Sequence, residues 1–201
     1  TGIWGTDKAG TSATGLTSGA TQVTKWSDYT YSTPIVDIEY AKTTVLQNTG
    51  FEPNTLVLSY SVFQKSKAHP TLVDRYKYTQ AGAIVTEDLL AALFGVDRVL
   101  VAKAVKNGAP EGATGSYSYT VGDNALLCYV APNPGLMTPS AGYSYMWTGV
   151  SGGLGTTVGV SRFRMEELKA DRVEGEIAFD NKVVAADLGY YYSNCISGAA
   201  I

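Results

Sequence analysis

The clearest hydrophobic pattern in the chain lies between residues 86 and 102, where a helical period gives way to a strand. Apolar residues recur at the spacing of one helix face between Thr86, which can cap a helix, and Gly95, which can end it. The apolar segment Arg98–Ala102 follows at once and has the composition of a short strand. The segment therefore predicts a helix packed on a sheet, and it contains nothing that resembles a reaction centre.

The rest of the first half alternates between helix and strand patterns. Pro34 is suited to the first position of a helix, because its missing N–H costs nothing there, and Gly50 is suited to end that helix. A short buried strand is predicted at residues 55–59, a helix at 61–68, and a further helical turn at 71–78. Residues 1–24, rich in Gly, Thr and Ser, are predicted to form an extended arm or loop.

The second half is dominated by strand patterns. Strands are predicted at residues 125–130, 143–147, 158–162, 173–180 and 189–196, with a hairpin arm at 117–121. The clearest alternation runs from Val173 to Asp180, where apolar and acidic positions exchange at every step. The glycine-rich segment 149–159 is interpreted as a hairpin tip between two strands. Together these patterns predict an α+β chain with two or three helices in its first half.

Composition suggests surface that is covered by other protein. Of the 201 residues 45% are apolar and 16% are charged, against about a quarter charged in an average domain. The 14 tyrosines also fit protein interfaces, where charged residues are depleted and tyrosine is enriched. The net charge of −3 argues against a dedicated nucleic-acid binder, which needs a basic face.

The two cysteines and the hydropathy indicate in which compartment the protein is expected. Cys128 lies in an apolar run, Cys195 lies near the end of the chain, and two thiols do not make a disulfide framework. We therefore expect a reducing compartment. No apolar run approaches the length of a membrane-spanning helix, and no signal peptide is visible. The chain starts at Thr1, which leaves maturation cleavage and trimming as alternatives.

Residues that could support catalysis or bind a metal are sparse. The single histidine, His69, is interpreted as a surface residue at a helix end, with Asp74 within reach of a hydrogen bond. One histidine and two distant cysteines cannot complete a zinc tetrahedron without carboxylates. The sequence therefore predicts no catalytic residue, no metal ligand, no cofactor-binding residue and no cofactor.

Charged pairs and one glycine-rich loop were weighed as alternatives. Glu87 with Asp88 is typical of a helix start, and Glu174 with Glu176 of an exposed strand face, although a retaining-glycosidase pair of carboxylates stays open. The glycine-rich loop lacks the Lys-Ser/Thr pair of a phosphate-binding P-loop. Arg162 and Arg164, on one strand face with a phenylalanine opposite, either pair with acidic groups of a neighbouring subunit or form a solvated surface.

An ordered series of segments along nearly the whole chain resembles a known family, the major capsid proteins of tailed bacteriophages, which have the Hong-Kong-97-like fold. The segments that carry the resemblance are residues 33–39, 49–58, His69-Pro70, Asp74-Arg75, Lys77-Tyr78, Leu89-Leu90-Ala91, 94–99, 136–142, Arg162-Phe163-Arg164, 170–176 and Phe179-Asp180. None of them is diagnostic alone. The chain lacks candidates for the family's long spine helix and extended loop, and it therefore resembles a carboxy-terminal portion.

The resemblance implies an organisation into axial and peripheral domains. Residues 1–30 are expected to form an extended arm or linker, residues 31–165 an axial-type α+β domain, and residues 166–201 the closing strands of a peripheral-type domain. The fold class is therefore α+β, mostly axial domain with closing peripheral strands.

The function implied by the resemblance is structural, not enzymatic. The chain is expected to self-assemble into the icosahedral shell that encloses phage DNA, with copies of itself in pentamers and hexamers as partners, and scaffold, portal and decoration proteins as further candidates. No sequence-specific nucleic-acid binding and no membrane contact are expected. The protein is placed in the virion after assembly in the host cytoplasm. A bacterial nanocompartment shell protein and a hydrolase that uses acidic residues are the alternatives.

Overall fold

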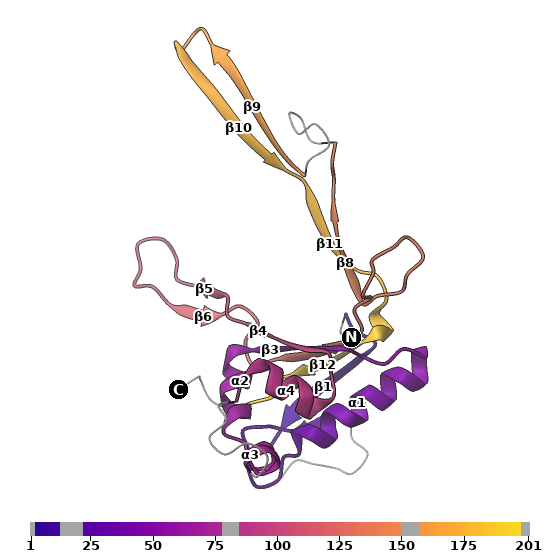
Figure 1. The fold of residues 1–201 in the computed structure, drawn as a ribbon. Coiled ribbons are helices and arrows are strands. Elements are labelled where there is room, and N and C mark those ends of the chain that lie inside the picture. Colours follow the sequence, from indigo (N-terminus) through magenta and orange to yellow (C-terminus); the bar gives the residue numbers. More distant parts are fainter. Residues whose placement is uncertain (1–2, 13–21, 78–84, 150–156, 198–201) are drawn as a thin grey trace. The chain divides into compact units, whose positions relative to one another are not determined.

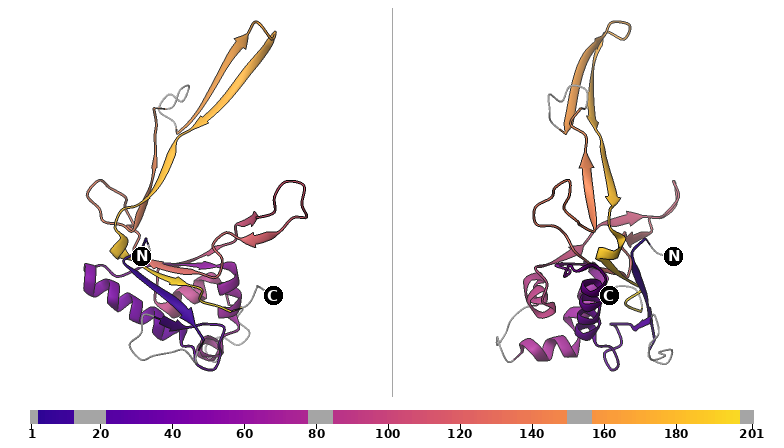
Figure 2. Two further views of the ribbon diagram at one scale, coloured as in Figure 1. Left: turned by 180° about the vertical axis from the view of Figure 1, so that it is seen from behind. Right: turned by 90° about the vertical axis from the view of Figure 1, so that its right-hand side faces the viewer.

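The chain forms two compact units. The computed structural model describes residues 3–12, 22–77, 85–149 and 157–197. One unit consists of Thr1–Ala141 together with Ala185–Ile201, and the other of Gly142–Val184. We call the first the sheet unit, because a mixed β-sheet runs through it, and the second the ladder unit, because it is built of two-stranded ladders (Figures 1 and 2).

The sheet unit contains a six-stranded sheet in the order β2-β1-β12-β7-β3-β4. The strands are β1 (Thr6–Thr11), β2 (Gln22–Thr24), β3 (Thr55–Ser59), β4 (Arg98–Ala102), β7 (Ala125–Cys128) and β12 (Gly189–Ser193). The pairs β1/β2, β1/β12 and β3/β4 are parallel, while β7 pairs antiparallel with both β3 and β12. The sheet unit also carries a short hairpin of β5 (Val105–Asn107) and β6 (Tyr117–Tyr119), where a hairpin arm was predicted.

Among the described residues, four helices accompany this sheet: α1 (Pro34–Thr49), α2 (Tyr60–Lys67), α3 (Pro70–Tyr76) and α4 (Glu87–Phe94). A 3-10 turn, η2 (Ala186–Leu188), precedes β12. The predicted ends of α1 and α4 are confirmed. The Thr86 hydroxyl accepts a hydrogen bond from the Leu89 N–H at 3.3 Å, and Gly50 and Gly95 end their helices in the left-handed conformation. No helix among the described residues is long and apolar enough to cross a membrane.

The core lies between the helices and the sheet. Side chains from α1, α4 and the central strands are almost fully buried in one cluster, which includes Ile38, Leu56, Leu58, Leu90, Leu127, Tyr190 and Tyr192. Tyr190 and Tyr192 point into the core while Tyr191 between them is half-buried, because successive strand residues face opposite sides. The α+β fold class is thus confirmed for the described residues.

For the described residues 3–12 and 22–30, the prediction of an extended arm or linker is wrong. Strands β1 and β2 are part of the sheet, with Thr6 opposite Tyr190 in a parallel register, and the Trp26 side chain is only 1% exposed in the core. A side chain at Gly10 would collide with the backbone of Asn194, so glycine lets β1 approach the end of β12. The high threonine and glycine content of this segment therefore gave no sign of β1, which is a strand because it pairs with β12.

The ladder unit consists of two antiparallel pairs. Strand β8 (Gly142–Met146) pairs with β11 (Phe179–Val183), and β9 (Val158–Met165) pairs with β10 (Ala170–Ile177). The sequence predicted that the glycine-rich segment is the tip of a hairpin formed by its two flanking strands. This prediction is wrong, because β8 and β9 pair with different strands. Residues 150–156 of the segment lie outside the described part of the chain.

A boundary between the axial-type and peripheral-type domains was expected between residues 165 and 166. The structure instead divides the chain after Ala141 and again after Val184. The expected boundary falls at the turn between β9 and β10, whose eight paired positions hold both strands in one unit. The last strand, β12, lies at the centre of the sheet unit instead of closing a separate domain. The physical reason is that antiparallel pairing returns the chain to the sheet at residue 185, so that one unit is formed from two distant segments.

Candidate assembly surfaces

Large apolar side chains are exposed along the first ladder, β8 with β11. The Trp147 side chain is 63% exposed and that of Phe179 is 60% exposed. They line a shallow pocket of about 440 Å³ together with Tyr145, Met146, Ala178 and Asp180. Contiguous exposed apolar surface of this kind, rich in aromatic residues and methionine, is typical of protein–protein interfaces.

The second ladder, β9 with β10, is exposed on both faces. The register places Val160 opposite Gly175 and Val158 opposite Ile177, so that their side chains share one face with Val173. More than half of each of these valine and isoleucine side chains is exposed. On the other face the Arg172 guanidinium lies over the Phe163 ring, at 5.6 Å from its centroid.

Arg162 and Arg164 lie on one face with Phe163 opposite, as predicted, but their acidic partner is in the same hairpin. The Arg162 Nη2 group donates to Oδ2 of Asp171 at 2.6 Å, and Arg164 Nη1 donates to Oδ1 of the same carboxylate at 3.3 Å. Arg164 also lies 3.8 Å from Glu166. All these groups are solvent-exposed, so each pair stabilises the hairpin by no more than about 1 kcal/mol.

These ladders do not have the burial that usually stabilises a sheet. A two-stranded ribbon is marginal in water unless a third strand or a helix covers a hydrophobic face. No residue of β10 or β11 is buried, and the only buried position in β9 is Gly159. The exposed apolar faces of the ladder unit therefore form a surface suited to contact with other protein.

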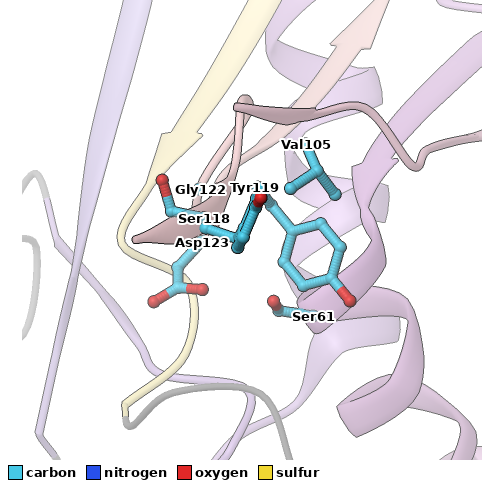
Figure 3. A pocket seen from close by; sticks show the side chains of 7 residues that line it. Ser61, Val105, Ser118, Tyr119, Gly122 and Asp123 are labelled. Carbon is cyan, nitrogen blue, oxygen red and sulfur yellow. The ribbon is translucent and has the colours of Figure 1, made fainter. Parts of the chain in front are cut away.

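The sheet unit has two further exposed apolar features. In the loop after β7 the side chains of Leu136 and Met137 are almost completely exposed, between the prolines of a stiff segment. A second feature is a pocket of about 520 Å³ at the β5–β6 hairpin, lined by Ser61, Val105, Tyr117, Ser118, Tyr119, Gly122 and Asp123 (Figure 3). Its walls are largely apolar, and among the described lining residues Asp123 supplies a carboxylate.

The one strongly perturbed carboxylate, Asp37, lies inside the sheet unit and not at these surfaces. Burial raises the pKa of Asp37 from 3.8 to about 6, although the hydrogen bond that its carboxylate accepts from Trp26 Nε1 at 3.0 Å acts in the opposite direction. Asp37 lines neither the pocket on β8 and β11 nor the pocket at the β5–β6 hairpin among the described residues. Its carboxylate fixes the segment after β2 to α1, which is a structural role.

The prediction that His69 is a surface residue is wrong. Its side chain is fully buried at the start of α3, where Nδ1 accepts a hydrogen bond from the Thr71 N–H at 3.3 Å, and Nε2 lies 2.8 Å from the Ser32 hydroxyl. Burial lowers the pKa of His69. Asp74 pairs with Lys77 and not with the histidine. Hydrogen bonds to the two ring nitrogens compensate the burial of the imidazole. In the sequence, the adjacent Pro70 indicated a helix boundary at His69, but nothing indicated that the ring would be buried.

The acidic pairs are dispersed. Glu87 and Asp88 lie in the first turn of α4, as predicted, and Glu87 is 3.5 Å from Lys103. Glu174 contacts Arg172 on the same strand. A different pair, Glu39 and Glu52, lines a small pocket in which Glu52 forms a 2.8 Å ion pair with Lys42. Within the described residues no group of three or more His, Cys, Asp or Glu side chains could hold a metal ion.

Both thiols are buried and unreactive in character. Burial raises the pKa of Cys128 to about 11 and that of Cys195 to about 12. Neither forms a disulfide.

Comparisons with known proteins show what the chain as a whole is similar to. The resemblance to phage capsid proteins is confirmed: over 81% of its length the chain is 31% identical to a protein named as a phage major capsid protein. That relative is the major capsid protein of Burkholderia phage BcepMu, and the chain spans about half its length. A crystal structure of a phage-related protein from Bordetella bronchiseptica RB50 superposes with a TM-score of 0.68 and 31% identity, over 85% of this chain and 54% of that one. No protein-family model matches the chain.

Proposed function

We propose that the chain is part of a major capsid protein that assembles into the icosahedral shell of a tailed bacteriophage. The observation that carries the proposal is the similarity to the BcepMu capsid protein over most of this chain. The exposed apolar ladders supply a physical reason, because a shell subunit needs broad lateral contacts. Individually weak contacts suffice, since closure of a shell multiplies them.

The finer assignments follow from the same proposal. The fold is of the Hong-Kong-97 type, the sheet unit is the axial-type domain, and the ladder unit belongs to the peripheral-type domain. Copies meet in pentamers and hexamers, and scaffold, portal and decoration proteins bind the assembled shell. The protein assembles in the host cytoplasm and resides in the virion, without enzymatic activity. A nanocompartment shell would share this fold, but the similarity to a named phage protein favours the phage.

The test is expression of the full-length protein followed by electron microscopy and sedimentation. Icosahedral shells or capsomers are expected. A strictly monomeric full-length protein at high concentration, with its phage assembly factors present, would overturn the proposal.

A pair of ladder variants then examines the proposed surface. We expect Trp147→Ala with Phe179→Ala to reduce the yield of shells at least tenfold, because the pocket on β8 and β11 loses its two most exposed aromatic rings. Asp74→Ala, at an exposed position of α3, serves as the control and should leave the yield unchanged. Unchanged assembly of the double variant would remove this pocket from the interface.

A further inference from the structure

We propose that the turn at the tip of the β9–β10 hairpin of one copy binds in the β5–β6 pocket of a second copy, with Leu168 against the apolar walls and the Lys169 ammonium against Asp123. The inference rests on the proposed function, because it requires that copies of the chain meet in an assembly. Beyond the proposed function, the inference specifies which segment of one copy contacts which pocket of a neighbouring copy.

The hairpin tip has residues that its own fold does not require. The turn between β9 and β10 covers Glu166 to Lys169 and is closed by a hydrogen bond from the Lys169 N–H to the Glu166 carbonyl at 3.3 Å. Lys169 has a φ of +49°, in the left-handed region that turns usually fill with Gly, Asn or Asp. Leu168 beside it is 68% exposed. A solvated turn gains nothing from either side chain.

The charges at this tip leave the lysine available. The turn also contains two exposed carboxylates, of which Glu166 lies 3.8 Å from Arg164, and neither Glu166 nor Glu167 forms an ion pair with Lys169 among the described residues. The Lys169 ammonium has no ion pair with any residue in the described ranges. The tip therefore presents an exposed leucine next to an available cation.

The pocket presents the complementary pair of properties. Val105, Tyr117 and Tyr119 form apolar walls. The Tyr119 ring also packs against the Tyr60 ring, with a distance of 5.5 Å between the ring centroids. The Asp123 carboxylate has no ion pair within 4 Å among the residues that the structure describes. Partial burial raises its pKa, and the more distant charge of Lys25 offsets this only in part. An additional cation would therefore be favourable here.

Size and reach are compatible with this contact. The pocket volume of about 520 Å³ falls in the range of cavities that bind whole small molecules, so it has room for two side chains. Eight-residue strands place the tip about 27 Å from the base of the β9–β10 ladder, at roughly 3.4 Å per residue. Contact between a tip and a pocket on different surfaces is heterologous, and such contacts close into rings when the rotation allows.

Charge reversal in the full-length protein tests the contact. Asp123→Lys and Lys169→Glu are each expected to reduce the yield of assembled particles at least tenfold, and the double variant to restore it to within threefold of wild type. Asp74→Lys is the control for a charge change at an exposed site outside the contact. Rescue by the double variant separates a broken contact from a folding defect. Single variants that assemble normally, or a double variant no better than the singles, would overturn the inference.

A disulfide trap identifies the partner. Leu168→Cys combined with Ser118→Cys is expected to give covalent dimers and larger chains on oxidation of assembled particles, while the buried Cys128 and Cys195 add little background. Cross-linked monomers alone would show that the tip reaches the pocket of its own chain and would refute the contact between copies. If the wild type assembles but these tests fail, only this inference is lost; if it never assembles, the proposed function is lost as well.

Discussion

Replacing Asp37 by Asn is expected to stabilise the folded chain at neutral pH. Burial raises the pKa of this carboxyl from 3.8 to about 6, so the folded protein holds its proton more tightly than the unfolded chain does. A tenfold change in an ionisation constant corresponds to 1.36 kcal/mol, and the ionised carboxylate therefore costs the folded state about 3 kcal/mol. Asn keeps an amide oxygen that can accept the hydrogen bond from Trp26.

The sign of the pH dependence follows from where the protons are bound. Below about pH 4 Asp37 is protonated in both states and contributes nothing. Between about pH 4 and pH 6 the unfolded chain releases this proton while the folded chain retains it, so the free energy of unfolding falls as the pH rises. Above about pH 6 the loss is complete. The wild type should thus lose about 3 kcal/mol from this group across that window, and Asp37→Asn should lose none.

Urea denaturation at a series of pH values between 4 and 8 measures the effect. The difference in unfolding free energy between Asp37→Asn and wild type should be near zero at pH 4 and should reach its full value by pH 7. Asp180→Asn, at an exposed position of β11, is the control and should follow the wild type. A variant no more stable than wild type at pH 7.5 would refute the reasoning, because it would mean that the first turn of α1 stabilises the ionised carboxylate enough to cancel its desolvation.

Three other measurements address the sheet unit. Leu127→Ala should lower the unfolding free energy by about 2–5 kcal/mol in urea denaturation, because the side chain is fully buried in the core cluster. Thr86→Ala should cost about 1 kcal/mol by removing the cap of α4, and Thr86→Ser should cost less; equal losses would argue against the cap. Cys128 and Cys195, whose pKa values burial raises to about 11 and about 12, should resist iodoacetamide at pH 8 until urea unfolds the chain, and rapid labelling of the native protein, followed by mass spectrometry, would contradict their burial.

Local patterns were sufficient where local chemistry decides the structure. Helices α1 and α4 begin and end close to where Pro34, Thr86 and their closing glycines predict, because caps and left-handed glycines act within one turn of the chain. The alternation from Val173 to Asp180 correctly indicated strand, but the structure divides it between β10, which ends at Ile177, and β11, which begins at Phe179. The sequence also led to the prediction of a structural role, which is the function that we propose from the similarity to a capsid protein.

Features that depend on distant partners were not predictable in this way. His69 is buried because Ser32, 37 residues earlier in the chain, and Thr71 satisfy its ring nitrogens, and only the fold brings Ser32 there. Asp37 is likewise perturbed by a core that includes Tyr192, whose hydroxyl donates to the Asp37 carbonyl from 155 residues away. No residue spacing in the sequence predicts the buried environment of His69 or that of Asp37.

The sequence by itself determined the ends of α1 and α4, the apolar face of α4, the α+β class and the resemblance to capsid proteins. These features depend on side chains a few residues apart or on their order along the chain. Only the tertiary structure decided that the first residues pair with the last strand, that the second half divides into two ladders, and which apolar side chains stay exposed. Strand pairing joins residues that are far apart in the chain, and burial depends on everything that packs around a side chain, so neither is contained in a local pattern.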